Sequence, residues 1–472
     1  MLLVGKHISC CVSALASPVK ADVQWAAVIA QGVCVARVAA FASGLAVVVL
    51  NVACSSSRDN SSGKQITVGM LIQQSDTGDS QKEIGAGLLA MRQVNSAGGI
   101  RIDDTNYELA VLAEDHQGTA AGTVAAMQRL AEQGVTATIG PPWSSLALGQ
   151  LPDHSDGATL AARRFNMLMI SASATASAIT DLPDDDLQWR TIPSDAAQAE
   201  IGAKEILSRG LLRAAVLYRD DSWGQGLAQA FQTFYKAGGG TITAVVKYEP
   251  EGASIPDLNV YDFNSELDSV FADKPDVVLL YNFNEVFQIT NRIALGGYLD
   301  RYSTGHPLFF GSDANMSRDL TSNGAPEVIR YMEGTSPTSD QSNPYYQEFL
   351  DWLTRAQLDT ADNTAAPRYD AINLLAAAMQ KANSIEADDV KVQLQTVSRR
   401  GDGKQDVYAG QWAATRSALL AGKEVNYDGV SGGIEFSDKG DPTTGLYTIW
   451  KVVEAADGMF SLDLSKTVPY GD

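Results

Sequence analysis

Residues 135–148 read VTATIGPPWSSLAL, and this stretch decides the fold class. A short β-rich strand runs into a Gly-Pro-Pro turn, and the residues from Ser144 onward favour a helix. The same alternation begins at Ile66, and its helices are closed by glycine, as at Gly98 and Gly134. Strands separated by helices of this length predict right-handed βαβ units on a largely parallel sheet, and therefore an α/β fold.

The alternation of strands and helices occurs in two sets. The first set covers residues 66–171, and the second runs from a helix at 194–210 to a strand at 307–313. The last third is mixed, with a helical stretch at 368–384 and a strand candidate at 445–454. Two similar α/β halves predict a molecule with two lobes.

Composition excludes several classes of function. The 472 residues are 45% hydrophobic and carry a net charge of −21, so nucleic acid is not an expected partner. Beyond Cys54 there is no further cysteine, and the only histidines are His116, His154 and His306. We therefore expect no metal site and no cofactor. Since the chain also lacks a Gly-x-Ser-x-Gly elbow, we do not expect an enzyme.

The opening segment predicts export. Residues 38–53, VAAFASGLAVVVLNVA, carry no charge but are shorter than the ~20 residues that span a bilayer. Cys54 follows, at a position that resembles a bacterial lipoprotein processing site, although Asn51 stands where that pattern prefers leucine. We expect residues 1–54 to be an export segment with Cys54 lipidated, and residues 55–64 to be a flexible linker. The alternative is an ordinary cleaved signal in which Cys54 is incidental.

Nine motifs occur in the order seen in type I periplasmic binding proteins. The pattern most closely resembles the leucine/isoleucine/valine-binding branch of the receptor family ligand-binding region, whose fold is shared by metabotropic glutamate receptor ligand-binding domains. The resemblance covers roughly residues 65–465, and nine motifs in order are more specific than any one of them. The motifs are LLAMRQVNSAGGI, LAEDHQGTAAGTVAAMQRL, TIGPPWSSLAL, LMISASATAS, QWRTIPSDAAQA, LYRDDSWGQGLAQAF, FFGSDA, RYDAINLLAAAMQKA and YDGVSGGIEFSDKGD.

The resemblance implies two α/β lobes, joined by three crossovers, that close on a ligand like a hinged clamp. It assigns residues 65–192 and 316–440 to lobe 1, and residues 193–315 and 441–472 to lobe 2. The ligand is expected between the lobes, at the carboxyl ends of the strands, where open α/β sheets usually bind.

Four serine and threonine positions match the part of the family site that holds a ligand carboxylate. Ser144 and Ser145 open a helix, whose N-terminus carries unpaired N–H groups. Ser173 and Thr175 follow the next strand and match positions that touch the carboxylate and the amine of the ligand. The alternative for each of them is a capping role without a ligand.

Two aspartates match positions that face a ligand ammonium in amino-acid-binding relatives. Asp195 lies at the first crossover, and Asp313 ends a strand at the second. The alternative is that both make only local bonds at a helix start or a turn. Trp223 stands at a family position often held by tyrosine, and Phe283 matches the wall of lobe 2.

The function implied by the resemblance is that of an exported solute-binding lipoprotein. It would bind an amino acid or similar small molecule, deliver it to the permease of an ABC transporter, and be held at the membrane by its lipid anchor. The alternative is a sensor or regulatory lipoprotein with the same clamp. Residues 399–433 have no role that the sequence predicts.

Overall fold

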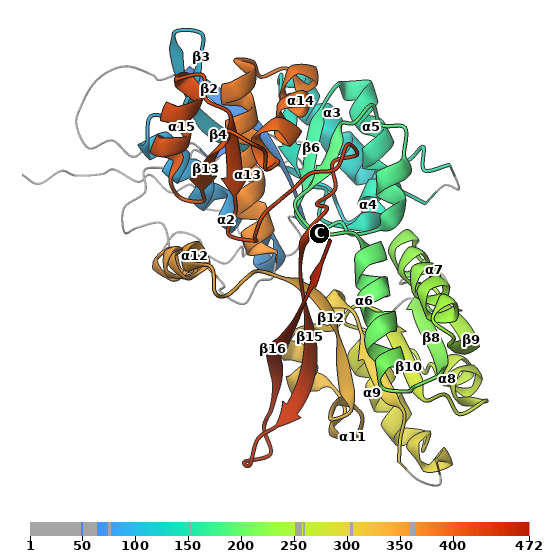
Figure 1. Cartoon of the computed structure of the whole chain (residues 1–472). Helices are drawn as coiled ribbons and strands as arrows, with labels where there is room; N and C mark the ends of the chain where they lie inside the picture. The colour runs from blue at the N-terminus through green and yellow to red at the C-terminus, as the bar shows by residue number, and fades with distance from the viewer. Residues whose placement is uncertain are drawn as a thin grey trace, which may run out of the picture.

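The structure is a computed structural model. It describes Val49–Leu50 and residues 64–471, except 74–76, 151–152, 251–256, 258–259, 303–304 and 359–363. The predicted export segment, Cys54 and the linker lie outside the described residues, apart from Val49–Leu50 and Lys64. Figure 1 shows two α/β lobes, one above the other, with long segments crossing between them.

The first lobe is built on a sheet whose described strands lie in the order β1-β4-β2-β5-β6-β7, with β3 beside β4. Neighbouring strands from β4 to β7 are parallel, whereas β1 and β3 pair with β4 in the antiparallel sense. Helices cover both faces (Figure 1), which explains why the central strands β5 and β6 are buried throughout. The strands are β1 (Val49–Leu50), β2 (Lys64–Ile72), β3 (Ile100–Ile102), β4 (Thr105–Asp115), β5 (Ala137–Ile139), β6 (Leu168–Ser171) and β7 (Gln188–Arg190).

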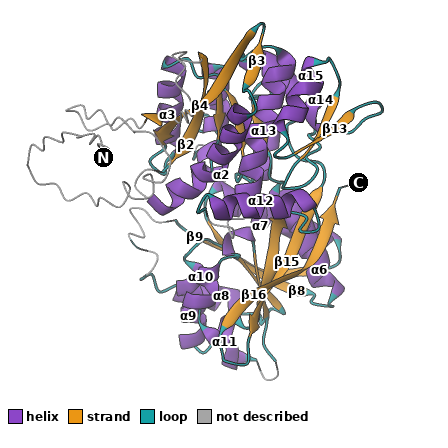
Figure 2. Cartoon of the chain, turned by 90° about the vertical axis from the view of Figure 1, so that its left-hand side faces the viewer, coloured by secondary structure: helices purple, strands orange, loops and turns teal. Residues whose placement is uncertain are grey.

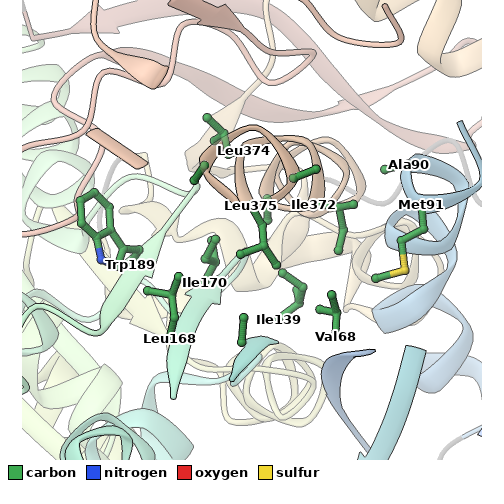
Figure 3. Close-up of a cluster of buried hydrophobic side chains, with 14 of the residues drawn as sticks. Val68, Ala90, Met91, Ile139, Leu168, Ile170, Trp189, Ile372, Leu374 and Leu375 are labelled. Carbon is green, nitrogen blue, oxygen red and sulfur yellow. The ribbon is translucent and has the colours of Figure 1, made fainter. Parts of the chain in front are cut away.

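One helix, α13, lies in the middle of the first lobe and is buried along almost its whole length. Figure 3 shows its residues Ile372 and Leu375 facing Val68, Ile139 and Ile170 of the sheet. The helical elements of this lobe are α2 (Thr77–Ser96), α3 (Ala120–Glu132), α4 (Ser144–Leu148), α5 (Ala158–Phe165), η1 (Ser177–Asp181), α12 (Pro344–Arg355), α13 (Ala365–Ala382), α14 (Ala387–Ser398) and α15 (Trp412–Leu420).

The segment 399–433 completes the core of the first lobe. Its strands β13 (Gln405–Tyr408) and β14 (Val425–Asp428) pair in parallel, and α15 connects them. The indole of Trp412 donates to the carbonyl of Gly99 at 3.0 Å, and the hydroxyl of Tyr427 donates to buried Asp370 on α13 at 2.7 Å. The segment is therefore part of the folded lobe rather than an appended loop.

The second lobe is built on a sheet whose described strands lie in the order β16-β15-β12-β11-β10-β8-β9. The strands from β9 to β12 are parallel, and β15 and β16 form an antiparallel hairpin on the edge. Figure 2 shows this hairpin along the second lobe, with β16 returning toward the first. The strands are β8 (Arg213–Arg219), β9 (Thr241–Tyr248), β10 (Val277–Tyr281), β11 (Leu308–Gly311), β12 (Met332–Thr338), β15 (Gly445–Glu454) and β16 (Phe460–Tyr470).

The helices of the second lobe bury one face against its sheet. In α7 the residues Trp223, Leu227, Phe231 and Tyr235 follow a four-residue spacing, and all four are buried. The helical elements of this lobe are α6 (Asp195–Ser208), α7 (Ser222–Ala237), α8 (Asn264–Phe271), α9 (Val286–Leu295), η2 (Leu299–Arg301), η3 (Asp313–Asn315), α10 (Arg318–Asn323) and α11 (Pro326–Ile329).

The structure differs from the expected boundary between the lobes at one place. Residues 316–338 were expected in lobe 1, but α10 and α11 pack with the second core, and β12 pairs with β11. The reason is that β11, these short helices and β12 form one more parallel crossover unit. The strand Met-Glu-Gly-Thr-Ser-Pro-Thr lacks the β-branched apolar run by which the sequence identified the other strands.

Three crossovers join the two lobes, at residues 191–194, 339–343 and 441–444. A cavity of about 30 Å³ lies where they meet, and residues from all three line it. The end of β16 also reaches this hinge, since the hydroxyl of Tyr470 donates to the carbonyl of Pro442 at 2.8 Å. Across the described residues, no helix is both long and apolar enough to cross a membrane, and no group of side chains suits a metal ion.

Candidate ligand-binding site

Ser144, the first residue of α4, and Thr175, on the loop after β6, follow neighbouring strands of the first lobe, β5 and β6. The hydroxyl oxygen of buried Ser144 accepts hydrogen bonds from the main-chain N–H groups of Thr175, at 3.1 Å, and Ala176, at 3.0 Å. A hydroxyl that accepts two bonds still has its own hydrogen to donate. Because helix α4 has only five residues, its dipole is small, and the hydroxyl of Ser144 is the stronger donor that this helix start offers.

Ser145 and Ser173 lie at the same edge of the sheet, but their contacts differ from those of Ser144. The hydroxyl of Ser173 donates to the carbonyl of Pro142 at 2.7 Å, which ties the β6 loop to the β5 loop. Ser145 is half-buried, and its carbonyl accepts a hydrogen bond from the N–H of Gly149 at 2.9 Å. Ser173 thus has a positioning role in this structure.

Asp195 is the first residue of α6, directly after the first crossover. The cap of this helix is Ser194, whose hydroxyl accepts from the N–H of Ala196 at 3.4 Å. The N–H of Asp195 donates to the carbonyl of Thr175 at 2.8 Å, which places the aspartate beside the β6 loop. Its side chain is completely buried, and its carboxylate oxygens make no hydrogen bond of normal geometry among the described residues, although the Thr175 hydroxyl and the charge of Arg190 lie near enough to lower its pKa. Such a carboxylate is costly to bury in its charged form unless a partner arrives.

Asp313 begins η3, after β11, and forms an acidic pair with Asp195. The amide of Gln198 donates to Asp313 Oδ1 at 3.0 Å and to the carbonyl of Thr335 at 3.0 Å, which fixes the carboxylate of Asp313. Burial, with the charge of Asp313 as the second cause, raises the pKa of Asp195 to about 8. Burial also raises the pKa of Asp313, while the bond from Gln198 opposes that shift.

Two buried tyrosines, a third aspartate and one arginine lie around Asp195. The charge of Arg190, together with the Thr175 hydroxyl, opposes the rise in the pKa of Asp195. Burial and the charge of Asp195 raise the pKa of Tyr281, at the end of β10, well above its ordinary value. Tyr447 of β15 lies near both Asp195 and Asp313, and its hydroxyl donates to the carbonyl of Ser194 at 3.2 Å. Asp221, the cap of α7, adds negative charge to the same region.

Trp223 and Phe283 form an aromatic wall on the second lobe. Their rings stack, with centroids 4.7 Å apart and planes 18° apart, and Trp223 is buried. The guanidinium of Arg219 lies 5.3 Å from the Phe283 ring and is paired with Asp221 and Glu285. Because α7 also contacts α4 and η1 of the first lobe, the two lobes meet beside this wall.

The structure thus connects most of the predicted site residues by short links. Ser144, Thr175, Asp195 and Asp313 form a continuous path from the first lobe across the hinge. Trp223 and Phe283 belong to a neighbouring cluster that includes Tyr281. The sequence interpretation missed Gln198, Tyr281 and Tyr447. Gln198 lies about one helical turn after Asp195, and this spacing is a signal that could have identified it.

Replacing Ser173 with alanine is expected to cost stability and leave ligand affinity unchanged. The variant loses the bond to Pro142, for which we expect a loss of about 1 kcal/mol in the free energy of unfolding. Chemical denaturation and calorimetric titration would measure the two quantities. A large loss of affinity at normal stability would instead place the hydroxyl of Ser173 on the ligand.

The comparisons with known proteins agree with this geometry. Residues 85–455 match the family described as "Receptor family ligand binding region". The chain is 25% identical over 426 residues to the chemotactic signal transduction system substrate-binding protein BasB of Halobacterium salinarum, covering 87% of this chain and 92% of that protein. It is 25% identical over 366 residues to the Leu/Ile/Val-binding protein BraC3 of Rhizobium johnstonii, covering 77% and 84% of the two chains.

A solved structure extends the likeness to the fold. The branched-chain amino acid transporter substrate binding protein LivJ of Streptococcus pneumoniae, in complex with isoleucine, superposes with a TM-score of 0.63 at 19% identity. The match covers 86% of this chain and 100% of that one. The chain therefore belongs to the receptor family ligand-binding region and has the two-lobed α/β fold of type I periplasmic binding proteins.

Proposed function

We propose that this protein is an extracytoplasmic solute-binding protein that holds an amino acid, or a similar small molecule, between its lobes. The observation that carries the proposal is the completely buried carboxylate of Asp195, which lies beside the acidic Asp313 at the hinge and has Thr175 and Arg190 as the neighbours that favour its charged form. An ammonium group is the ligand chemistry that would compensate such a pair of acids.

The opposite end of the proposed ligand is a carboxylate. Ser144 retains a hydrogen to donate, and its oxygen is fixed by two main-chain amides of the β6 loop. The names of two similar proteins support the same class, because one binds leucine, isoleucine and valine and the other was solved with isoleucine. The aromatic wall of Trp223 and Phe283 would face the ligand side chain.

A matched pair of ligands tests the proposal. L-isoleucine and L-leucine should raise the melting temperature, because a ligand that binds only the folded state stabilises it. The same carbon skeletons without an amino group should give a much smaller shift. If the acids lacking an amino group bind as well as the amino acids, the ammonium assignment is wrong, although the clamp could still bind carboxylic acids.

We further propose that the two lobes hinge at their crossovers and that closure delivers the ligand to the permease of an ABC transporter. The alternative is a sensor. The likeness to a substrate-binding protein of a chemotactic signal transduction system, which covers 87% of this chain, favours that role. Deleting the gene and measuring both uptake and chemotaxis toward a confirmed ligand separates the two roles.

We also propose that the chain is exported and anchored through a lipid on Cys54. Val49 and Leu50 pair with β4 as β1, so cleavage before Cys54 would remove β1 from the sheet. Membrane fractionation and mass spectrometry of the mature protein should find an acylated Cys54, and Cys54→Ser should yield no lipidated form. A soluble wild-type product with a different, unmodified first residue would contradict the anchor.

A further inference from the structure

Arg190, the last residue of β7, favours the charged form of Asp195, and its side chain also makes a buried set of contacts apart from that aspartate. Its side chain is only 1% exposed, and its Nε donates to Asp441 Oδ1 at 2.5 Å. One terminal nitrogen donates to the carbonyl of Ala176 at 2.9 Å and reaches that of Ala174 at 3.4 Å. The other donates to the hydroxyl of Thr180 at 2.7 Å.

These contacts hold the same β6 loop that Ser144 holds. Thr175 lies between the two alanines whose carbonyls accept from Arg190, while its own N–H and that of Ala176 donate to Ser144. The loop is therefore fixed at its carbonyls by one side chain and at its amides by another. Neither Thr175 nor Ser144 can shift without breaking one of these sets of bonds.

The same guanidinium connects the loop to the hinge. Asp441 is the first residue of the third crossover, and its second carboxylate oxygen accepts from the hydroxyl of Thr180 at 2.7 Å. The N–H of Arg190 also donates to the carbonyl of Gly440 at 3.0 Å. Strand, loop, η1 and crossover thus meet at one buried cation.

A stabilising ion pair alone would not need this geometry. Burying two charges costs desolvation free energy, and buried pairs are often replaceable by apolar side chains without loss of stability. The planar fork of arginine, in contrast, satisfies two carbonyls, a hydroxyl and a carboxylate at once, which lysine cannot do. We propose that Arg190 is a positioning residue that holds the Thr175 loop in its ligand-binding geometry and fastens it, through Asp441, to the third crossover. This inference rests on the proposed function only for the identity of the ligand that the loop binds.

Arg190→Lys tests this role, because it keeps a positive charge beside Asp441 and removes the fork. In the ligand-free variant, the amides of Thr175 and Ala176 should exchange hydrogen at least tenfold faster, whereas amides of α13 should be unchanged. Affinity for L-isoleucine should fall at least tenfold through faster dissociation. Arg209→Lys is the matched control, since Arg209 pairs with Glu205 and Glu333 at the far end of α6 in the second lobe.

A second variant covers the case in which Arg190→Lys fails to fold. Thr180→Val keeps the shape of the side chain but removes one acceptor of Arg190 and one donor to Asp441. The amides of Thr175 and Ala176 should therefore exchange hydrogen faster and the affinity for L-isoleucine should fall, each by a smaller factor than in Arg190→Lys. Unchanged loop exchange in either folded variant overturns the positioning role. If wild-type protein binds no amino acid, the proposed function fails, but hydrogen exchange still decides the role of Arg190.

Discussion

Ligand-free wild-type protein is expected to lose about 3 kcal/mol of unfolding free energy, relative to its Asp195→Asn variant, between pH 6 and pH 9. Burial and the charge of Asp313 raise the pKa of Asp195 from its ordinary value of 3.8 to about 8 in the folded protein. Because the pKa of Asp195 is higher in the folded protein than in the unfolded chain, the protonated carboxyl stabilises the folded state. This stabilisation is complete below the unfolded pKa and is lost as the pH rises through about 8.

Chemical denaturation at several pH values would measure this difference. Asp313→Asn should move the loss to a lower pH, since the charge of Asp313 is the second cause of the raised pKa. Asp319→Asn, at an exposed position in the first turn of α10, is the control for the removal of one carboxylate. If the unfolding free energy of wild type and of Asp195→Asn changes with pH in parallel, the pKa of Asp195 is not raised, and the prediction is wrong.

Replacing Asp313 is expected to weaken an amino-acid ligand by roughly 30-fold to several thousand-fold. Removing one member of a buried, hydrogen-bonded charge pair typically costs ~2–5 kcal/mol, and each 1.4 kcal/mol is about tenfold in affinity. Gln198 already orients the Asp313 carboxylate in the absence of a ligand, so little further ordering is needed on binding.

Calorimetric titration of Asp313→Ala and Asp313→Asn with L-isoleucine would measure the effect, and Asp319→Asn again serves as the control. The alternative, in which Asp313 makes only local turn bonds, predicts lost stability and unchanged affinity in the folded protein. Binding within a few-fold of wild type in both Asp313 variants would exclude an ammonium contact at this position.

The α/β architecture could be predicted from sequence because its signals are local. Apolar strands such as Val277–Tyr281 and glycine-closed helices repeat along the chain, and each is recognisable within about ten residues. The strand Met332–Thr338 was missed as part of the second lobe because its β-structure depends on neighbours rather than on its own composition.

The candidate site could be predicted only in part. The family resemblance, through positions at the crossovers, identifies Asp195 and Asp313, and the structure brings them together. The bond of Ser173 to Pro142 depends on how two loops meet, which spacing does not encode. The partners of Arg190 lie up to 251 residues away in the chain, so its role appears only in three dimensions.

The return of β16 to the hinge matters for anyone who would turn this protein into a fluorescent biosensor. Tyr470 donates to Pro442 of the third crossover, so a reporter fused close after this residue would lie against the proposed hinge. Such a fusion would hinder closure of the lobes, and its own position would change little on closure. The tip of the hairpin, where Met459 is 68% exposed, offers an attachment point at the other end of the same strand. A dye there, paired with one on the first lobe, would report the distance between the lobes and leave the joint untouched.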